Sequence, residues 1–120
     1  MGDGTYNGWT NYATWGVALV LSNDRSTYDE TREYAAEYRR NAPTDDRVRE
    51  GIWTAGQCER FMLADRLRED VELMCEDATE GADETPQLMT RQIISASLAD
   101  VDWHEIAVNI LSELDESAAA

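Results

Sequence analysis

Apolar residues recur at intervals of three and four along most of the chain, and β-branched runs with a period of two are missing. This pattern is typical of amphipathic helices, so we predict an all-α fold, a compact bundle of four to five helices. The clearest apolar stripe follows Asp102, which forms a capping box with Glu105. Its members are Trp103, Ile106, Ala107, Ile110, Leu111 and Leu114.

Capping residues and helix breakers predict the boundaries of the first two helices. Asn11 is the expected N-cap of a helix over residues 12–22, which is apolar nearly all round, as the buried centre of a small bundle is. A capping box at Ser26 predicts a second helix over residues 26–40, and Pro43 follows its end.

The longest helix is expected over residues 57–78, with one apolar face and an opposite acidic stripe. Residues 44–56 hold at most a short helix, and residues 79–85 are expected to form a loop. Thr85 is the expected cap of another helix, with Pro86 in its first position. We expect this helix to end near residue 99 and to direct these side chains inward: Leu88, Met89, Gln92, Ile93, Ala96 and either Leu98 or Ala99.

The length of 120 residues fits one domain, residues 1–120, with an arm at 1–11 and a frayed tail at 116–120. Hydrophobic residues make up 42% of the chain, which is typical of a folded rather than a disordered protein. No apolar run approaches the ~20 residues of a membrane span. The first residues have no basic start and no apolar core, so we expect a cytoplasmic protein of the host cell.

The charge is strongly acidic and unevenly distributed. Ten arginines stand against 25 acidic residues, and the net charge is −15. This balance argues against direct binding to nucleic acid or to an anionic membrane surface. Residues 1–60 carry a net charge of −3 and residues 61–120 one of −12. We therefore expect one surface with a strong negative potential.

Residues that support catalysis or metal binding are scarce. His104 is the single histidine, and Cys58 and Cys75 form no CxxC pair. The two cysteines lie about 25 Å apart on one continuous helix, too far for a disulfide, so we expect reduced thiols. The sequence contains no Gly-rich phosphate loop, HExxH or GxSxG motif. We expect no enzyme activity, no cofactor and no metal site.

Four aromatic residues gather near the N-terminus: Tyr6, Trp9, Tyr12 and Trp15. Trp and Tyr often anchor protein interfaces, so the cluster could bind a partner. The structural interpretation, which we prefer, is an arm that folds back over the bundle, with Trp9 as a hydrophobic staple on the first helix.

Residues 6–19, which end in the letters NGWTNYATWGVAL, resemble a family of small uncharacterised proteins encoded by phages, plasmids and integrated elements. The family pattern is N-G-W-x-N-Y-E-T-W-N-V-A-L-W, and residues 63–69 and 98–107 also match. The sequence departs from the pattern at Ala13, Gly16 and Val20. The resemblance implies a mobile-element origin and supplies no activity or ligand.

The acidic stripe is the main functional lead. Carboxylates three or four residues apart on a helix are ~5–6 Å apart, similar to charges along a nucleic-acid backbone. We expect this surface to bind a basic, nucleic-acid-binding host protein, as a DNA mimic with anti-restriction or anti-CRISPR activity would. The expected contact residues are Glu69, Glu72, Glu76, Asp77, Glu80, Asp83 and Glu84, with Met62 and Leu73 as apolar anchors. The alternative is an accessory or structural phage or plasmid protein, such as a homodimer, whose acidity reflects solubility or high salt.

Overall fold

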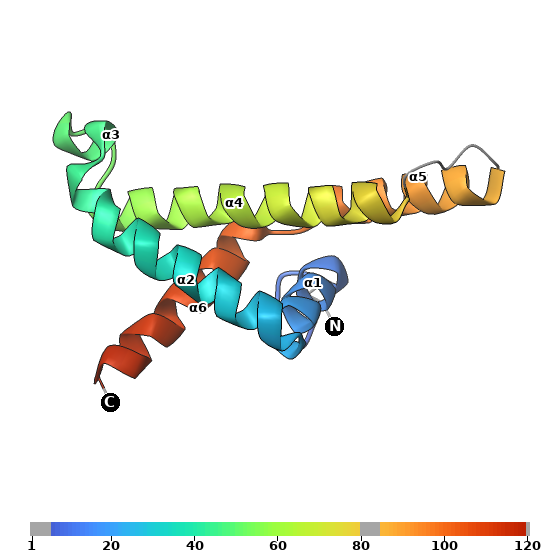
Figure 1. The fold of residues 1–120 in the computed structure, drawn as a ribbon, viewed down its shortest axis with the longest axis horizontal. Coiled ribbons are helices and arrows are strands. Elements are labelled where there is room, and N and C mark those ends of the chain that lie inside the picture. The colour runs from blue at the N-terminus through green and yellow to red at the C-terminus, as the bar shows by residue number, and fades with distance from the viewer. Residues whose placement is uncertain (1–5, 80–84, 120) are drawn as a thin grey trace.

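The structure is a computed structural model that describes residues 6–79 and 85–119. Within these ranges the chain forms helices and no strand, which confirms the predicted all-α fold (Figure 1). Five of the helices are long, and α3 is a single turn. The elements are α1 (Tyr12–Asn23), α2 (Arg25–Asn41), a 3-10 turn (Ala42–Thr44), α3 (Asp46–Arg49), α4 (Ala55–Ala78), α5 (Thr85–Ala99) and α6 (Trp103–Ala119).

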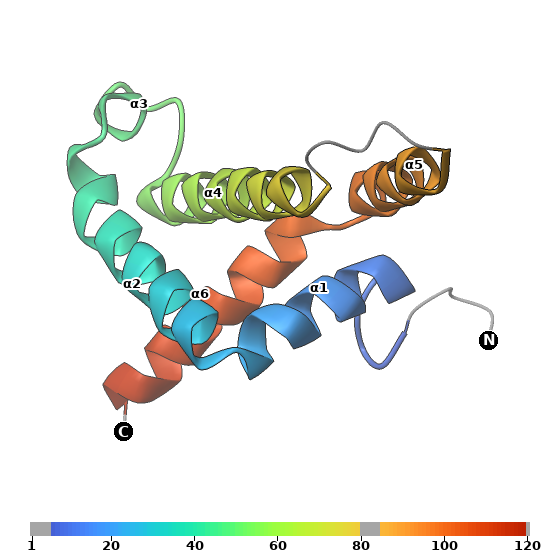
Figure 2. The ribbon, with the colours of Figure 1, turned by 45° about the vertical axis from the view of Figure 1, so that its right-hand side comes forward.

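Three helices enclose the core. α2 and α6 both cross beneath α4, and α1 packs against α2 and α6 at their side (Figure 2). Leu63 and Leu67 of α4 meet Ile106 of α6 there, and all three are at most 2% exposed. Ile110 and Leu111 are also buried, as the stripe after Asp102 predicts. The regular apolar faces of α4 and α6 therefore become the two main walls of the core.

α1 begins after Asn11, as predicted, but it does not occupy the centre of the bundle. It buries only one side, through Thr14, Ala18 and Leu21. Tyr12 and Val20, on its other side, are 64% and 66% exposed. The expectation of a buried central helix is wrong because α2, α4 and α6 already enclose one another, so α1 packs from outside.

The start of α2 also differs from the prediction. Asp24, and not Ser26, is the N-cap: its Oδ1 accepts a hydrogen bond from the Thr27 backbone N–H at 2.9 Å. The helix therefore begins at Arg25 and packs more centrally than its few apolar residues suggest. The short helix expected within residues 44–56 is α3, which Asp45 caps.

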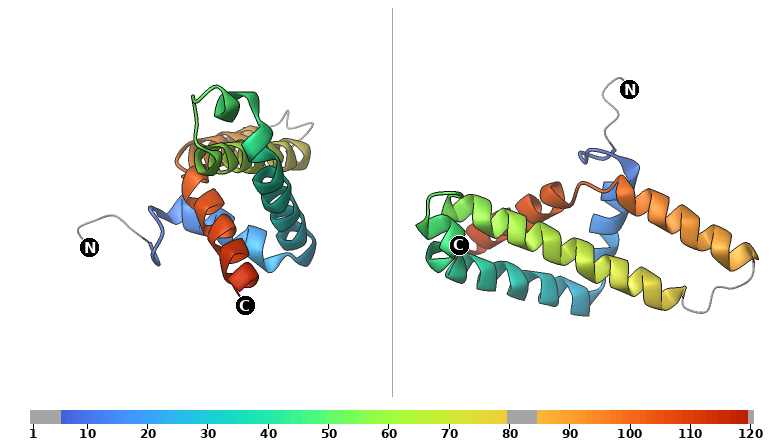
Figure 3. Two further views of the ribbon diagram at one scale, coloured as in Figure 1. Left: turned by 90° about the vertical axis from the view of Figure 1, so that its left-hand side faces the viewer. Right: turned by 90° about the horizontal axis from the view of Figure 1, so that it is seen from above.

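α4 begins earlier than predicted because Thr54 and Gln57 form a complete capping box. The helix then continues for 24 residues, or ~36 Å. Its C-terminal end extends past α1 and α2, with α5 alongside, as two views show (Figures 1 and 3). The loop expected after Thr79 lies outside the described residues, apart from Thr79 and Thr85.

The expected inward face of α5 is wrong except at Leu98, which packs against the core. Leu88, Met89 and Ile93 are 44%, 60% and 60% exposed, whereas Ile94 and Leu98 line the side that faces α4. α5 lies beside the extended end of α4 and touches little else, so only a narrow strip of its surface is covered. α6 runs to Ala119, through most of the segment expected to fray, and residue 120 lies outside the described residues.

The described part of the predicted N-terminal arm, residues 6–11, folds back on α1, and residues 1–5 lie outside the described residues. Asn7 and Gly8 both have positive φ, and Tyr6 and Trp9 exchange two backbone hydrogen bonds of 2.7 and 2.8 Å across the turn. This Asn-Gly turn has the form of a two-residue hairpin. The Tyr6 ring packs against Trp15 at 4.8 Å between ring centroids, and Trp9 packs on the core.

Two hydrogen bonds join the N-terminal segment to the start of α6. Thr14 Oγ1 accepts from the Asp102 N–H at 2.8 Å, and Glu105 accepts from the Thr10 N–H at 3.0 Å. Asp102 still caps α6 by accepting from the Glu105 N–H. The predicted capping box is therefore half formed, because the Glu105 side chain reaches Thr10 instead of Asp102.

Candidate functional site

The C-terminal half of α4 carries the exposed acidic surface. Glu69, Glu72, Glu76 and Asp77 are all exposed, and we call these four residues the acidic ridge. Glu72 pairs with Arg68 at 3.5 Å, and both side chains are 55% exposed. Within the described ranges, Glu69, Glu76 and Asp77 have no ion-pair partner. The predicted contact residues Glu80, Asp83 and Glu84 lie outside the described residues.

The position of the ridge on its helix strengthens its negative potential. Glu76 and Asp77 lie in the last turn of α4, where no basic residue is present. The C-terminal end of a helix carries the negative pole of the helix dipole, so acidic side chains there destabilise a helix, by roughly 0.3–1 kcal/mol each. These carboxylates therefore do not stabilise α4, and their position needs another explanation.

A groove with both apolar and polar lining residues lies on one side of the ridge. It has a volume of about 270 Å³ and runs between α4 and the α1–α2 corner. Leu73 and Met74 form its α4 wall and are 57% and 49% exposed, while Leu21 and Val71 belong to the core below. We call this cavity the Leu73 groove. Asp77 follows Leu73 by one helical turn, so a ridge carboxylate lies on the same side of α4 as the groove.

The rim of the Leu73 groove holds a network of polar side chains. Tyr34 donates a hydrogen bond to Glu30, which raises the pKa of Tyr34. Arg66 stacks over the Tyr34 ring at 4.0 Å and pairs with Asp70 at 3.2 Å. These contacts fix the position of Tyr34, so the groove has one rigid polar wall opposite the exposed Leu73.

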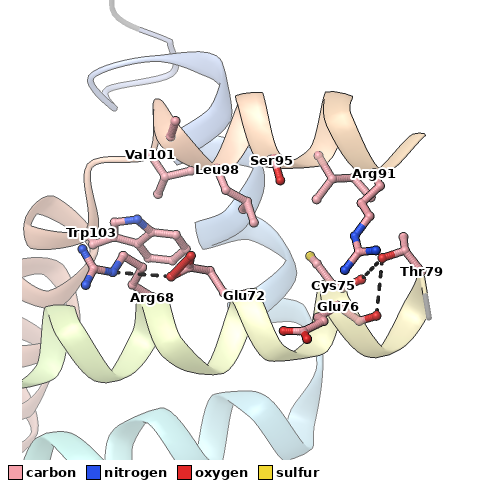
Figure 4. A pocket seen from close by; sticks show the side chains of 12 residues that line it. Arg68, Glu72, Cys75, Glu76, Thr79, Arg91, Ser95, Leu98, Val101 and Trp103 are labelled. Atoms are coloured by element: carbon pink, nitrogen blue, oxygen red, sulfur yellow. Dashed lines mark hydrogen bonds and ion pairs between the residues drawn. The ribbon is translucent and has the colours of Figure 1, made fainter. Parts of the chain in front are cut away.

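A second groove lies on the other side of the ridge, between α4 and α5. It has a volume of about 420 Å³, and Figure 4 shows Trp103 and Leu98 on one wall and Glu72 and Glu76 on the α4 side. Arg91 extends from α5 toward Thr79. The groove contains basic and acidic groups together, and Cys75 also lines it. Glu72 and Glu76 thus border this groove, whereas Leu73 borders the other.

Met62 is not beside the other predicted contact residues. It precedes Leu73 by eleven residues on α4, or ~16 Å. Its side chain is partly buried, and its sulfur accepts a hydrogen bond from Arg47 at 3.2 Å. The contact with Arg47 of α3 accounts for an apolar side chain at this position.

Arg32, Arg39 and Arg47 form ion pairs away from the acidic ridge. Arg39 joins three helices by pairing with Glu59 of α4 at 3.1 Å and with Asp115 of α6 at 2.7 Å. The hydrogen bond to Glu59 is the main cause that raises the pKa of Arg39. Arg32 pairs with Glu113, and Arg47 pairs with Asp45 at 3.0 Å. These three arginines therefore neutralise acids of the bundle, whereas Arg68 and Arg91 lie near the acidic ridge.

The remaining candidate groups show no catalytic arrangement in the part of the chain that the structure describes. His104 is exposed, and its ring lies 5.8 Å from that of Phe61. Cys58 and Cys75 are free thiols, as expected; burial raises the pKa of Cys58. The described residues contain no cluster of three metal-ligating side chains. None of the described helices is long and apolar enough to cross a membrane.

Met74, Tyr34 and Leu21 are part of the site although the sequence pattern did not predict them. The helical spacing places Met74 on the apolar face of residues 57–78 together with Leu67 and Val71, which predicts a core position. It instead lines the Leu73 groove opposite the α1–α2 corner and remains 49% exposed. The length of α4, which exceeds that of its neighbours, is the one sequence signal that indicates an exposed end.

These features define a small acidic helical protein with one extended, negatively charged helix end between two grooves. The chain belongs to DUF7249, a family of unknown function, and the match spans residues 2–117. Comparison with curated proteins and with solved structures found no match.

Proposed function

We propose that this protein binds a basic surface of another protein through the acidic ridge and the Leu73 groove. The observation that carries the proposal is the set of carboxylates at the C-terminal end of α4. They add to the negative pole of the helix, and Glu76 and Asp77 have no ion pair within the described ranges. A partner rich in Arg or Lys would neutralise them.

The Leu73 groove supplies the apolar contacts of the proposed interaction. Electrostatic attraction mainly raises the rate of association, whereas buried apolar contacts lengthen the life of a complex. Leu73 and Met74 are large, exposed and next to the ridge. An amphipathic segment of the partner, with apolar and basic side chains on adjacent faces, fits this arrangement.

The partner that we propose is a nucleic-acid-binding host protein. Glu69, Glu72 and Glu76 are three or four residues apart, which places successive carboxylates ~5–6 Å apart along one face of α4. A row of this kind can occupy a groove that normally holds a phosphate backbone. Together with the resemblance to phage- and plasmid-encoded proteins, this favours a mobile-element protein that inhibits a host defence nuclease by binding it.

The alternative proposal is an accessory or structural protein whose acidity serves only solubility. Such acidity should be spread over the whole surface. The charge of −3 for residues 1–60 and −12 for residues 61–120 favours a directed surface instead. We favour stoichiometric binding over catalysis. The single histidine, the residue type most often used as a general base, is exposed and lines neither groove.

Affinity capture with paired charge reversals tests the proposal. The protein is immobilised, incubated with bacterial lysate at low and high salt, and the captured proteins are identified by mass spectrometry. We expect basic nucleic-acid-binding proteins, lost at high salt and lost with Glu72→Arg plus Glu76→Arg. The matched control is Glu33→Arg plus Glu37→Arg, an exposed pair with the same spacing on α2. Equal loss with both pairs, or no loss with either, would overturn the proposal.

A further inference from the structure

The outer side of α5 is an apolar helix face that nothing in the described chain covers. Met89 and Ile93 are each 60% exposed, and Ala96 is exposed on the same side. These residues follow one another at spacings of four and three, which is the spacing of a helix face that pairs with another helix. The inner side, with Ile94 and Leu98, is already used against α4.

This face is also uncharged, in a chain of which 29% of the residues are charged. Arg91 is the only charged residue of the 15 in α5, and it points toward α4 (Figure 4). The neighbours of the apolar stripe on the outer side are Thr90, Gln92, Ser97 and Ala99. The outer side of α5 therefore offers a carboxylate-free strip ~22 Å long.

The absence of charge from this strip identifies the kind of partner. A basic partner would form no ion pairs with a face that has no carboxylates. We expect such a partner to bind the acidic ridge instead. A second copy of the chain carries the same net charge of −15 and is repelled by most of the surface. The outer side of α5 is a place where two copies can approach without bringing carboxylates together.

The pattern along the strip is complementary to itself. In an antiparallel pair about a two-fold axis, each contact occurs twice, because residue i meets residue j and residue j meets residue i. With the axis between Gln92 and Ile93, the large Met89 lies opposite the small Ala96 of the partner subunit. A large side chain then fills the space above a small one at both ends of the contact.

We propose that two copies of this protein associate through the outer faces of α5, antiparallel, with Ile93 next to the two-fold axis and Met89 at both ends of the contact. The contact is a single pair of helices, so it is small for a protein interface. The dimer is therefore expected to dissociate on dilution. The proposal is independent of the proposed function, because the dimer contact uses neither the acidic ridge nor the Leu73 groove.

Sedimentation equilibrium from micromolar to high micromolar concentration tests the proposal. The purified chain is expected to shift from monomer to dimer across this range, and Ile93→Glu is expected to remain a monomer. The control is Ile52→Glu, which adds the same charge at an isoleucine with nearly the same exposure, 62%, far from α5. This variant should dimerise like the unchanged chain. Circular dichroism should show equal helix content in all three.

Three results would overturn the proposal. The first is an unchanged chain that stays monomeric over the whole range. The second is a dimer that persists in Ile93→Glu. The third is a dimer that Val20→Glu, on the exposed face of α1, abolishes as completely as Ile93→Glu does. Loss of lysate capture by Glu72→Arg plus Glu76→Arg bears only on the proposed function, so the two proposals fail separately.

Discussion

Asp24 shows how a single side chain sets the start of a helix and makes it sensitive to pH. Its hydrogen bond from the Thr27 backbone N–H is the largest cause that lowers the pKa of Asp24. A carboxyl with a lowered folded-state pKa stabilises the fold above the pKa of the unfolded chain. That stability is lost as pH falls through the lowered folded-state pKa.

We therefore expect Asp24→Ala to lower the Tm at neutral pH, and the difference from the unchanged chain to shrink in strong acid. Thermal unfolding of both proteins by circular dichroism over a series of pH values measures this. The control is Asp29→Ala, because within residues 6–79 and 85–119 Asp29 pairs only with Arg25, whose side chain is 89% exposed. Such exposed pairs add little stability. A Tm difference that is unchanged in acid would contradict the assignment of Asp24 as the N-cap.

At the scale of the elements, the regular helices were predictable and their environments were not. The stripe from Trp103 to Leu114 has one apolar face, so both the helix and its buried side follow from the sequence. α1 and α5 have apolar residues on more than one side, and such a pattern is consistent with burial or with an uncovered face. Which of these holds depends on the length and crossing of α4, a tertiary property.

Local chemistry would have predicted one feature that periodicity did not. Asn7-Gly8 is a strong signal for a two-residue hairpin turn, since both residues tolerate positive φ. The turn directs the Tyr6 ring onto Trp15 and Trp9 onto the core. It therefore explains how residues 6–11 keep a defined position next to α1.

The arm gives the prediction for this scale. We expect Trp9→Ala to lower the free energy of unfolding by about 2 kcal/mol, the value of a largely buried aromatic side chain. Removal of residues 1–10, which leaves the Asn11 cap in place, should lower stability further, because the Thr10–Glu105 hydrogen bond is also lost. Urea unfolding measures both. Unchanged stability together with lost capture of the partner would instead identify the arm as a binding surface.

At the scale of the whole molecule, the separation of charge is the feature that most constrains function. Arg32, Arg39 and Arg47 pair with acids around the bundle, and the far end of α4 keeps its carboxylates exposed. The acidic ridge was predictable because helical spacing alone places Glu69, Glu72 and Glu76 on one face. The two grooves beside it were not, because they depend on where α1, α2 and α5 end.

The measurement that tests the central claim most directly is a residue-resolved titration. The isotope-labelled protein is titrated with a synthetic amphipathic helical peptide that carries leucines on one face and arginines on the other. NMR chemical shifts report which backbone amides respond. We expect the changes to concentrate at residues 69–77 and at Leu21 and Tyr34, which line the Leu73 groove. We also expect binding to weaken as salt rises.

Two variants make the titration decisive. Glu72→Arg plus Glu76→Arg should abolish the shift changes, and Glu33→Arg plus Glu37→Arg should leave them in place. If the changes instead spread over all acidic helices, including α2, or persist when Glu72 and Glu76 are reversed, the end of α4 is not a binding surface and the account is contradicted.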